Sequence, residues 1–85
     1  MDDDALMEKK KRHLHWLVSH GYRSTGKYTW LCLAVNNVTY KMTLMANMRW
    51  YCKCITSWAT AFGDGRTPWT AEFKAYKRLG GQNQS

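Results

Sequence analysis

The sequence is poor in acidic residues, proline and cysteine. Six Asp and Glu stand against thirteen Lys and Arg, which gives a net charge of +7. Four of the acids lie within the first eight residues, so Asp64 and Glu72 are the only acidic residues from Lys9 onward. A surface with so large an excess of positive charge attracts polyanions. Nucleic acid is the commonest polyanion, and an acidic face of another protein is the other partner of this kind.

Long apolar runs are also missing, and the cysteines are few. Cys32, Cys52 and Cys54 are an odd number without the dense spacing of a disulfide framework, and no signal-peptide pattern is present. We therefore expect reduced thiols and a cytoplasmic protein. Every apolar run is far shorter than the ~20 residues that cross a bilayer, so we expect no membrane-spanning segment.

The residue patterns of a catalytic or metal centre are absent as well. All three histidines lie between residues 13 and 20, and no motif links them to a nucleophile and an acid. Asp64, between two glycines, has no second carboxylate nearby for paired acid and base chemistry. The spacing of Cys52 and Cys54 does not match the usual spacing of zinc ligands. We predict a protein that is not an enzyme and that uses no metal or cofactor.

Aromatic residues, in contrast, are abundant for so short a chain. Five Trp, five Tyr and two Phe occur in 85 residues, a length that fits one domain over residues 1–85. Each ring buries a large area, and a small core does not need this many rings. We therefore expect some of the rings to be exposed.

The N-terminal segment has the pattern of an amphipathic helix over residues 3–20. Leu14, Leu17 and Val18 fall near one face, with acids in the first turn and a glycine just past the end. The basic run at residues 9–12 lies on another face and is typical of a solvated surface. Residues 21–27 favour turns and predict a loop that carries two cations.

Two stretches rich in β-forming residues, 28–35 and 38–45, flank a pair of asparagines and predict a β-hairpin. If Val35 opposes Val38, alternation places one apolar set in the core: Leu31, Leu33, Val35, Val38, Tyr40, Met42 and Leu44. We expect the other face to meet solvent or a partner; it holds Tyr28, Trp30, Cys32, Thr39, Lys41 and Thr43.

The segment after the hairpin supports two interpretations. Apolar residues recur at spacings of three and four from Asn47 to Phe62, and Gly63 and Gly65 end the pattern, which favours a helix. Residues 49–54 also alternate as in a strand, and their β-forming side chains support that alternative. Whether residues 49–56 are strand or helix stays open at this level.

The C-terminal part begins with a clear helix start, because Thr67 is a typical N-cap and Pro68 suits the first helical position. A stripe of rings follows, formed by Trp69, Phe73 and Tyr76. Residues 82–85 are expected to be a frayed tail. The whole pattern predicts a small α+β domain with an N-terminal helix, a β-hairpin and two helices packed on the hairpin. The alternative is a three-stranded antiparallel sheet with N- and C-terminal helices.

Basic residues interleaved with aromatic ones form the strongest functional pattern. Cations neutralise phosphates and exposed rings stack on bases, so we predict a nucleic-acid-binding accessory protein. The candidate contact residues lie around the hairpin and on the last helix: Arg23, Lys27, Tyr28, Trp30, Lys41, Lys74, Lys77 and Arg78.

A protein partner is the alternative. Exposed Trp, Tyr, Met and Arg are the residue types associated with protein-binding surfaces. They suit a small inhibitor or adaptor of the kind that phages and mobile elements encode, which would block a larger host complex by binding an acidic face of it. A homo-oligomer formed through the hairpin edge is compatible with either function.

Overall fold

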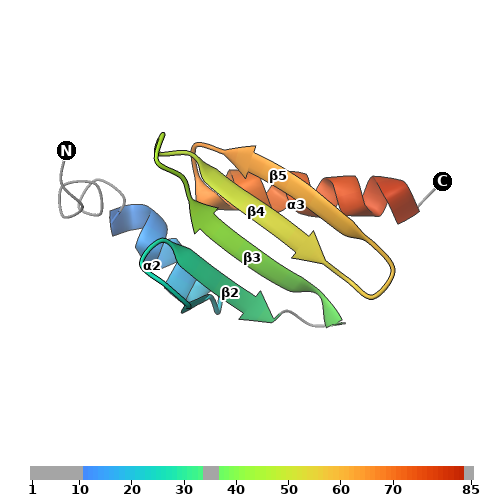
Figure 1. The fold of residues 1–85 in the computed structure, drawn as a ribbon, viewed down its shortest axis with the longest axis horizontal. Helices are drawn as coiled ribbons and strands as arrows, with labels where there is room; N and C mark the ends of the chain where they lie inside the picture. Colours follow the sequence, from blue (N-terminus) through green and yellow to red (C-terminus); the bar gives the residue numbers. More distant parts are fainter. Residues whose placement is uncertain (1–10, 34–36, 84–85) are drawn as a thin grey trace.

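The computed structural model describes residues 11–33 and 37–83. Within them, five antiparallel strands form one sheet in sequence order, and the helices α2 (Lys11–Ser19) and α3 (Pro68–Asn83) pack against the same face of it (Figure 1). The strands are β1 (Arg23–Ser24), β2 (Thr29–Leu33), β3 (Thr39–Leu44), β4 (Trp50–Ile55) and β5 (Thr60–Gly65). Each strand pairs with the next along the chain, as in a β-meander.

The predicted hairpin is present as β2 and β3, but its register differs from the predicted one. The structure pairs Leu31 with Lys41, one residue away from the register in which Val35 opposes Val38. Such a shift moves every side chain of one strand to the other face of the sheet. The turn predicted between these strands falls partly outside the described residues.

The shift exchanges the buried and exposed side chains of β2. Trp30 and Cys32, predicted to be exposed, are buried, whereas Leu33, predicted for the core, is 77% exposed. The ring of Trp30 lies 5.3 Å from that of Trp50 in the core. An indole buries more apolar area than a leucine, so the register that covers Trp30 is the more stable one.

The predicted helix over residues 47–62 is wrong, because this segment forms β4 and the beginning of β5. Trp50 pairs with Gly65, and the Thr56 hydroxyl, hydrogen-bonded to the backbone of the connecting turn, closes this second hairpin. Aromatic and β-branched residues favour the strand. The spacing of four that indicated a helix is ambiguous, since residues four apart also share one face of a strand.

Helix α3 lies close to the sheet because small residues meet at the contact. Ala71 and Ala75 are fully buried. A Cβ added to Gly63 on β5 would lie 2.5 Å from both the Ala71 carbonyl oxygen and the Ala75 nitrogen. Gly63 and Gly65, predicted to end a helix, instead give β5 a bare surface on which α3 packs.

The helix start at Thr67 and Pro68 is confirmed, and the Thr67 hydroxyl accepts a hydrogen bond of 3.2 Å from the Thr70 backbone N–H. The predicted stripe of rings, however, is not the buried side of α3. These rings are 37%, 62% and 57% exposed in Trp69, Phe73 and Tyr76. The alanine–glycine contact fixes the rotation of the helix about its axis and turns the larger side chains away from the sheet.

Helix α2 closes the end of the core beside β1 and β2. It is the described part of the predicted N-terminal helix, and the rest of that prediction lies outside the described residues. Leu17 is fully buried, whereas Val18, predicted near the same face, is 71% exposed. The Trp50 indole donates a 3.1 Å hydrogen bond to Nδ1 of His13, which ties α2 to β4.

The predicted architecture of two helices packed on a hairpin is therefore wrong, and so is the alternative with three strands, because the sheet has five. The N-terminal helix, the hairpin and the C-terminal helix occur in the predicted order. One error lies in the segment between the hairpin and α3. The other lies in residues 21–27, predicted as a loop, where Arg23–Ser24 form β1 and pair with β2. Neither helix in the described part of the chain is long and apolar enough to cross a membrane.

Candidate nucleic-acid interface

The face of the sheet opposite the helices carries its own set of side chains. Both helices pack behind the sheet in Figure 1, and no helix or strand among the described residues covers the front. Alternate residues of the strands therefore point outward. We call this surface the open face; it comprises Arg23, Thr29, Leu31, Leu33, Thr39, Lys41, Thr43, Tyr51, Lys53, Ile55, Thr60, Phe62 and Asp64.

A row of cations crosses the open face from strand to strand. The registers pair Arg23 with Leu31, Leu31 with Lys41, and Lys41 with Lys53. Directly paired side chains share a face, and neighbouring strands lie about 4.8 Å apart. We call Arg23, Lys41 and Lys53 the cation row. Lys41 directly opposes Lys53, and such a like-charged pair is unfavourable without an anion to compensate it.

Two exposed rings lie beside the cation row. Lys53 pairs with Phe62 on β5, and its Nζ lies 5.7 Å from the centroid of that ring, a cation–π distance. The ring centroids of Tyr51 and Phe62 are 5.8 Å apart. The two residues are 36% and 41% exposed. Aromatic surface and positive charge are therefore adjacent on the open face.

Two arginines border a hollow where β4 begins and β5 ends. The hollow measures about 390 Å³ and is lined by Asn47, Met48, Arg49 and Arg66. Arg49 donates from Nε and Nη2 to Oδ2 of Asp64, at 3.2 and 2.9 Å. Their side chains are 41% and 50% exposed, and an ion pair so open to water contributes at most about 1 kcal/mol. An anion that enters the hollow can therefore compete for Arg49.

The predicted stacking rings lie on the helix side of the sheet. The exposure predicted for Trp30 is wrong because the ring is buried, and Tyr28 is half-buried against the core. Lys27 stays exposed in the turn after β1, with Nζ 5.8 Å from the Tyr28 ring centroid. Of the predicted contact residues, the open face brings together Arg23 and Lys41.

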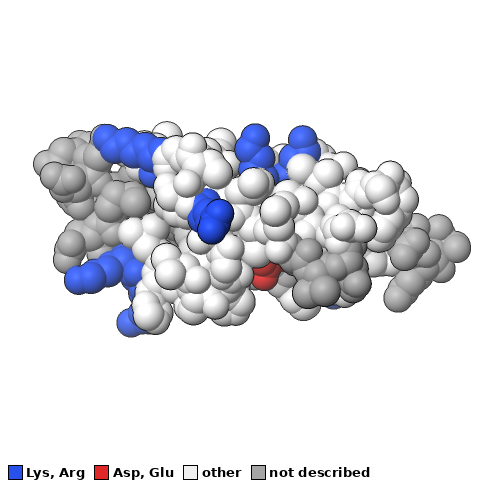
Figure 2. All heavy atoms as spheres, turned by 90° about the horizontal axis from the view of Figure 1, so that it is seen from below, with Lys and Arg blue, Asp and Glu red and all other residues white. Residues whose placement is uncertain are grey.

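The predicted cations of the last helix form a second, separate surface. Lys74, Lys77 and Arg78 are exposed on α3, which lies behind the sheet. Arg78 donates from Nη1 to the Phe62 carbonyl oxygen at 2.6 Å, so it reaches the edge strand β5. Figure 2 shows Lys and Arg at several separate places, with one small acidic patch among them. Positive charge is thus distributed over the molecule.

Lys53, Tyr51 and Phe62 are part of this site but were not predicted for it. The helical interpretation of their segment hid the fact that Tyr51 and Lys53, two residues apart on β4, lie on the same face of the sheet. No family model, curated protein or solved structure matches this chain. The open face is therefore interpreted from its own geometry and charge. The usable signal in the sequence was the strand-like alternation of residues 49–54.

The three cysteines lie in the core, and none of them forms a disulfide. Burial raises the pKa of the Cys52 thiol to about 12 and also raises the pKa values of Cys32 and Cys54. Protonated, enclosed thiols are poor nucleophiles. Within residues 11–33 and 37–83, no three His, Cys, Asp or Glu side chains are grouped closely enough to hold a metal ion.

Proposed function

We propose that this chain is a nucleic-acid-binding accessory protein that holds a single strand on the open face. The proposal is carried by the direct opposition of Lys41 and Lys53 beside the exposed rings of Tyr51 and Phe62. A bound phosphate backbone would neutralise the like charges, while the rings stack on unpaired bases. Antiparallel sheets with exposed rings bind bases in this way in RNA-recognition domains.

The charge balance supports a polyanionic partner. The chain carries a net charge of +7, and the one carboxylate of the open face, Asp64, is already paired with Arg49. Each phosphate that a Lys or Arg contacts releases condensed counterions, which makes the affinity fall with salt. Three buried, unbridged thiols suit the reducing conditions of the cytoplasm.

The experiment is fluorescence anisotropy with labelled single-stranded and duplex DNA and RNA at about 50 and 200 mM salt. We expect single strands to bind more tightly than duplexes. Replacing Lys41 and Lys53 together by Ala should lower the slope of log affinity against log salt by about 1.4, because each phosphate contact to a single strand contributes about 0.7. Tyr51→Ala and Phe62→Ala should each weaken binding about 5- to 150-fold.

The matched control is a variant that combines Lys74→Ala and Lys77→Ala, which removes the same charge from the outer side of α3. This variant should keep the single-strand affinity and preference of the native protein to within about twofold. Equal losses in the two double variants would contradict a site on the open face and indicate attraction by net charge alone. Absence of binding at low salt would contradict the proposed function as a whole.

A second candidate function is that of a small protein-binding inhibitor or adaptor of the phage or mobile-element type. It is favoured by Leu33, which is 77% exposed, and by Ile55, which lies across the open face in the same row. A flat apolar patch with a polar rim is typical of the centre of a protein interface. A host protein that binds the native chain but not the Leu33→Asp variant would support this function; unchanged binding of Leu33→Asp would contradict it.

A further inference from the structure

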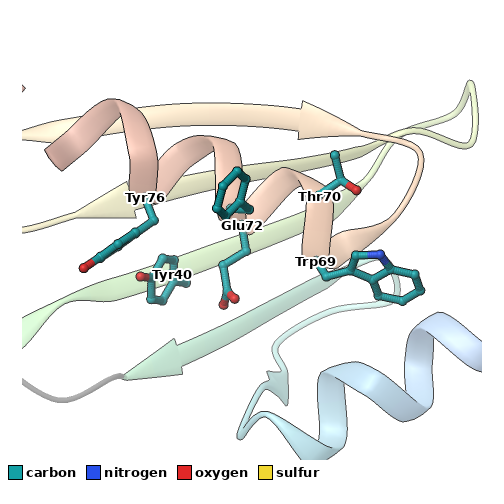
Figure 3. A pocket seen from close by; sticks show the side chains of 6 residues that line it. Tyr40, Trp69, Thr70, Glu72 and Tyr76 are labelled. Carbon is teal, nitrogen blue, oxygen red and sulfur yellow. The ribbon is translucent and has the colours of Figure 1, made fainter. Parts of the chain in front are cut away.

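A groove lies on the helix side of the molecule, between α3 and β3. It measures about 610 Å³ and opens to solvent, and its walls are mostly apolar. Five labelled side chains in Figure 3 show its lining, to which Phe73 also belongs: Tyr40, Trp69, Thr70, Glu72 and Tyr76. The groove is separated from the open face by the sheet itself.

Glu72 places a carboxylate inside this aromatic groove. In Figure 3 its side chain points from α3 toward the space between Tyr40 and Trp69. The Tyr22 hydroxyl donates a 2.6 Å hydrogen bond to Oε1 of Glu72, which holds the carboxylate in place. Among the described residues no Lys or Arg forms an ion pair with Glu72. Within the described part of the chain, the carboxylate of Glu72 therefore has a hydrogen-bond donor but no paired cation.

The rings around the carboxylate are held in different ways. Trp69 contacts His13 edge to face at 5.2 Å and Trp16 at 5.9 Å, so α2 supports it from behind. Tyr40 is half-buried on β3, whereas Tyr76 is 57% exposed and lies beside it at the groove wall. Aromatic faces attract cations through their quadrupole, most strongly where water is partly excluded.

We propose that the groove binds an organic cation, an ammonium or guanidinium group whose charge meets Glu72 and whose apolar part meets Tyr40, Trp69 and Tyr76. The combination of a carboxylate with aromatic walls favours a cation over an anion or a neutral apolar ligand. An anion would be repelled by Glu72, and a neutral apolar ligand would desolvate the carboxylate without a cation to compensate its charge. Lys77, 5.9 Å from the Phe73 ring centroid, already shows this cation–π geometry at the edge of the groove.

The test uses choline and N-acetyl-arginine amide as probes, with 3,3-dimethylbutanol as the neutral isostere of choline. Binding is followed by NMR through the indole N–H signal of Trp69, which is assigned with a Trp69→Phe variant. We expect at least one of the two cations to bind about tenfold more tightly than the isostere. Preference for choline would assign an ammonium ligand, and preference for the arginine derivative a guanidinium ligand.

Glu72→Gln is the decisive variant, because the amide oxygen can still accept the Tyr22 hydrogen bond while the charge is lost. It should weaken cation binding about tenfold and leave the weak binding of the isostere unchanged. Tyr76→Leu, at an exposed ring, should weaken cation binding without loss of the fold, which circular dichroism verifies. Equal binding of cation and isostere, or unchanged cation affinity in Glu72→Gln, would overturn the proposal. The nucleic-acid function does not depend on this outcome, since its contacts lie on the other face of the sheet.

Discussion

Gly63 shows how the absence of one side chain sets the position of a helix. A Cβ at this position would lie 2.5 Å from backbone atoms of Ala71 and Ala75, which cannot move aside without moving α3. We expect Gly63→Ala to destabilise the protein by about 1–3 kcal/mol or more in urea unfolding. Gly80→Ala is the control, because its Cβ would meet no atom within 4 Å. That change should stabilise α3 by about 0.5–1 kcal/mol, and a similar loss in both variants would contradict the close approach.

The buried Cys52 thiol makes the free energy of unfolding depend on pH in the alkaline range. Burial raises its pKa from 9.0 to about 12 in the folded protein. Between these values the unfolded chain loses the proton while the folded chain keeps it, so the free energy of unfolding falls as pH rises. Below pH 9 this contribution is fully present. Urea unfolding from pH 7 to 11 should therefore show a smaller decline in Cys52→Ala than in the native protein; parallel declines would contradict the assignment.

At the scale of elements, the register of β2 decides which leucine-sized side chains matter for stability. Leu33 is 77% exposed and Met42, on the neighbouring strand, is fully buried. We expect Leu33→Ala to change the free energy of unfolding by less than about 0.5 kcal/mol, and Met42→Ala to lower it by about 2–5 kcal/mol. Urea unfolding measures both. Met42 is buried in either register, so a loss of about 2–5 kcal/mol in Leu33→Ala as well would support the register in which Leu33 is buried.

Elements were predictable where local chemistry and tertiary packing favour the same conformation. The Thr67–Pro68 start of α3 is such a case, because capping and a fixed φ angle act within one turn. The β4–β5 segment is the opposite case. Its glycines weaken the strand signal locally, and the reason for them, the approach of α3, lies in another part of the chain. The same approach of α3 turns its aromatic stripe away from the sheet.

At the scale of the whole molecule, the sheet separates two surfaces of different charge character. The cation row lies on one side, and the groove with Glu72 lies on the other. Sites without shared contacts usually contribute additively to binding. We therefore expect saturating choline or arginine derivative to leave the single-strand affinity unchanged within about twofold at constant ionic strength, as measured by anisotropy. A larger change would show that the two surfaces are coupled through the sheet.

The sequence by itself determined the elements and properties that depend on local pattern. These are the excess of positive charge, the hairpin of β2 and β3, and the start of α3. The tertiary structure decided which face of each strand is buried. Both faces of β2 carry apolar residues, and the contact of Trp30 with Trp50 determines which face is buried. For the same reason Lys41 and Lys53 became neighbours only through the pairing of β3 with β4, a contact between strands that no local pattern encodes.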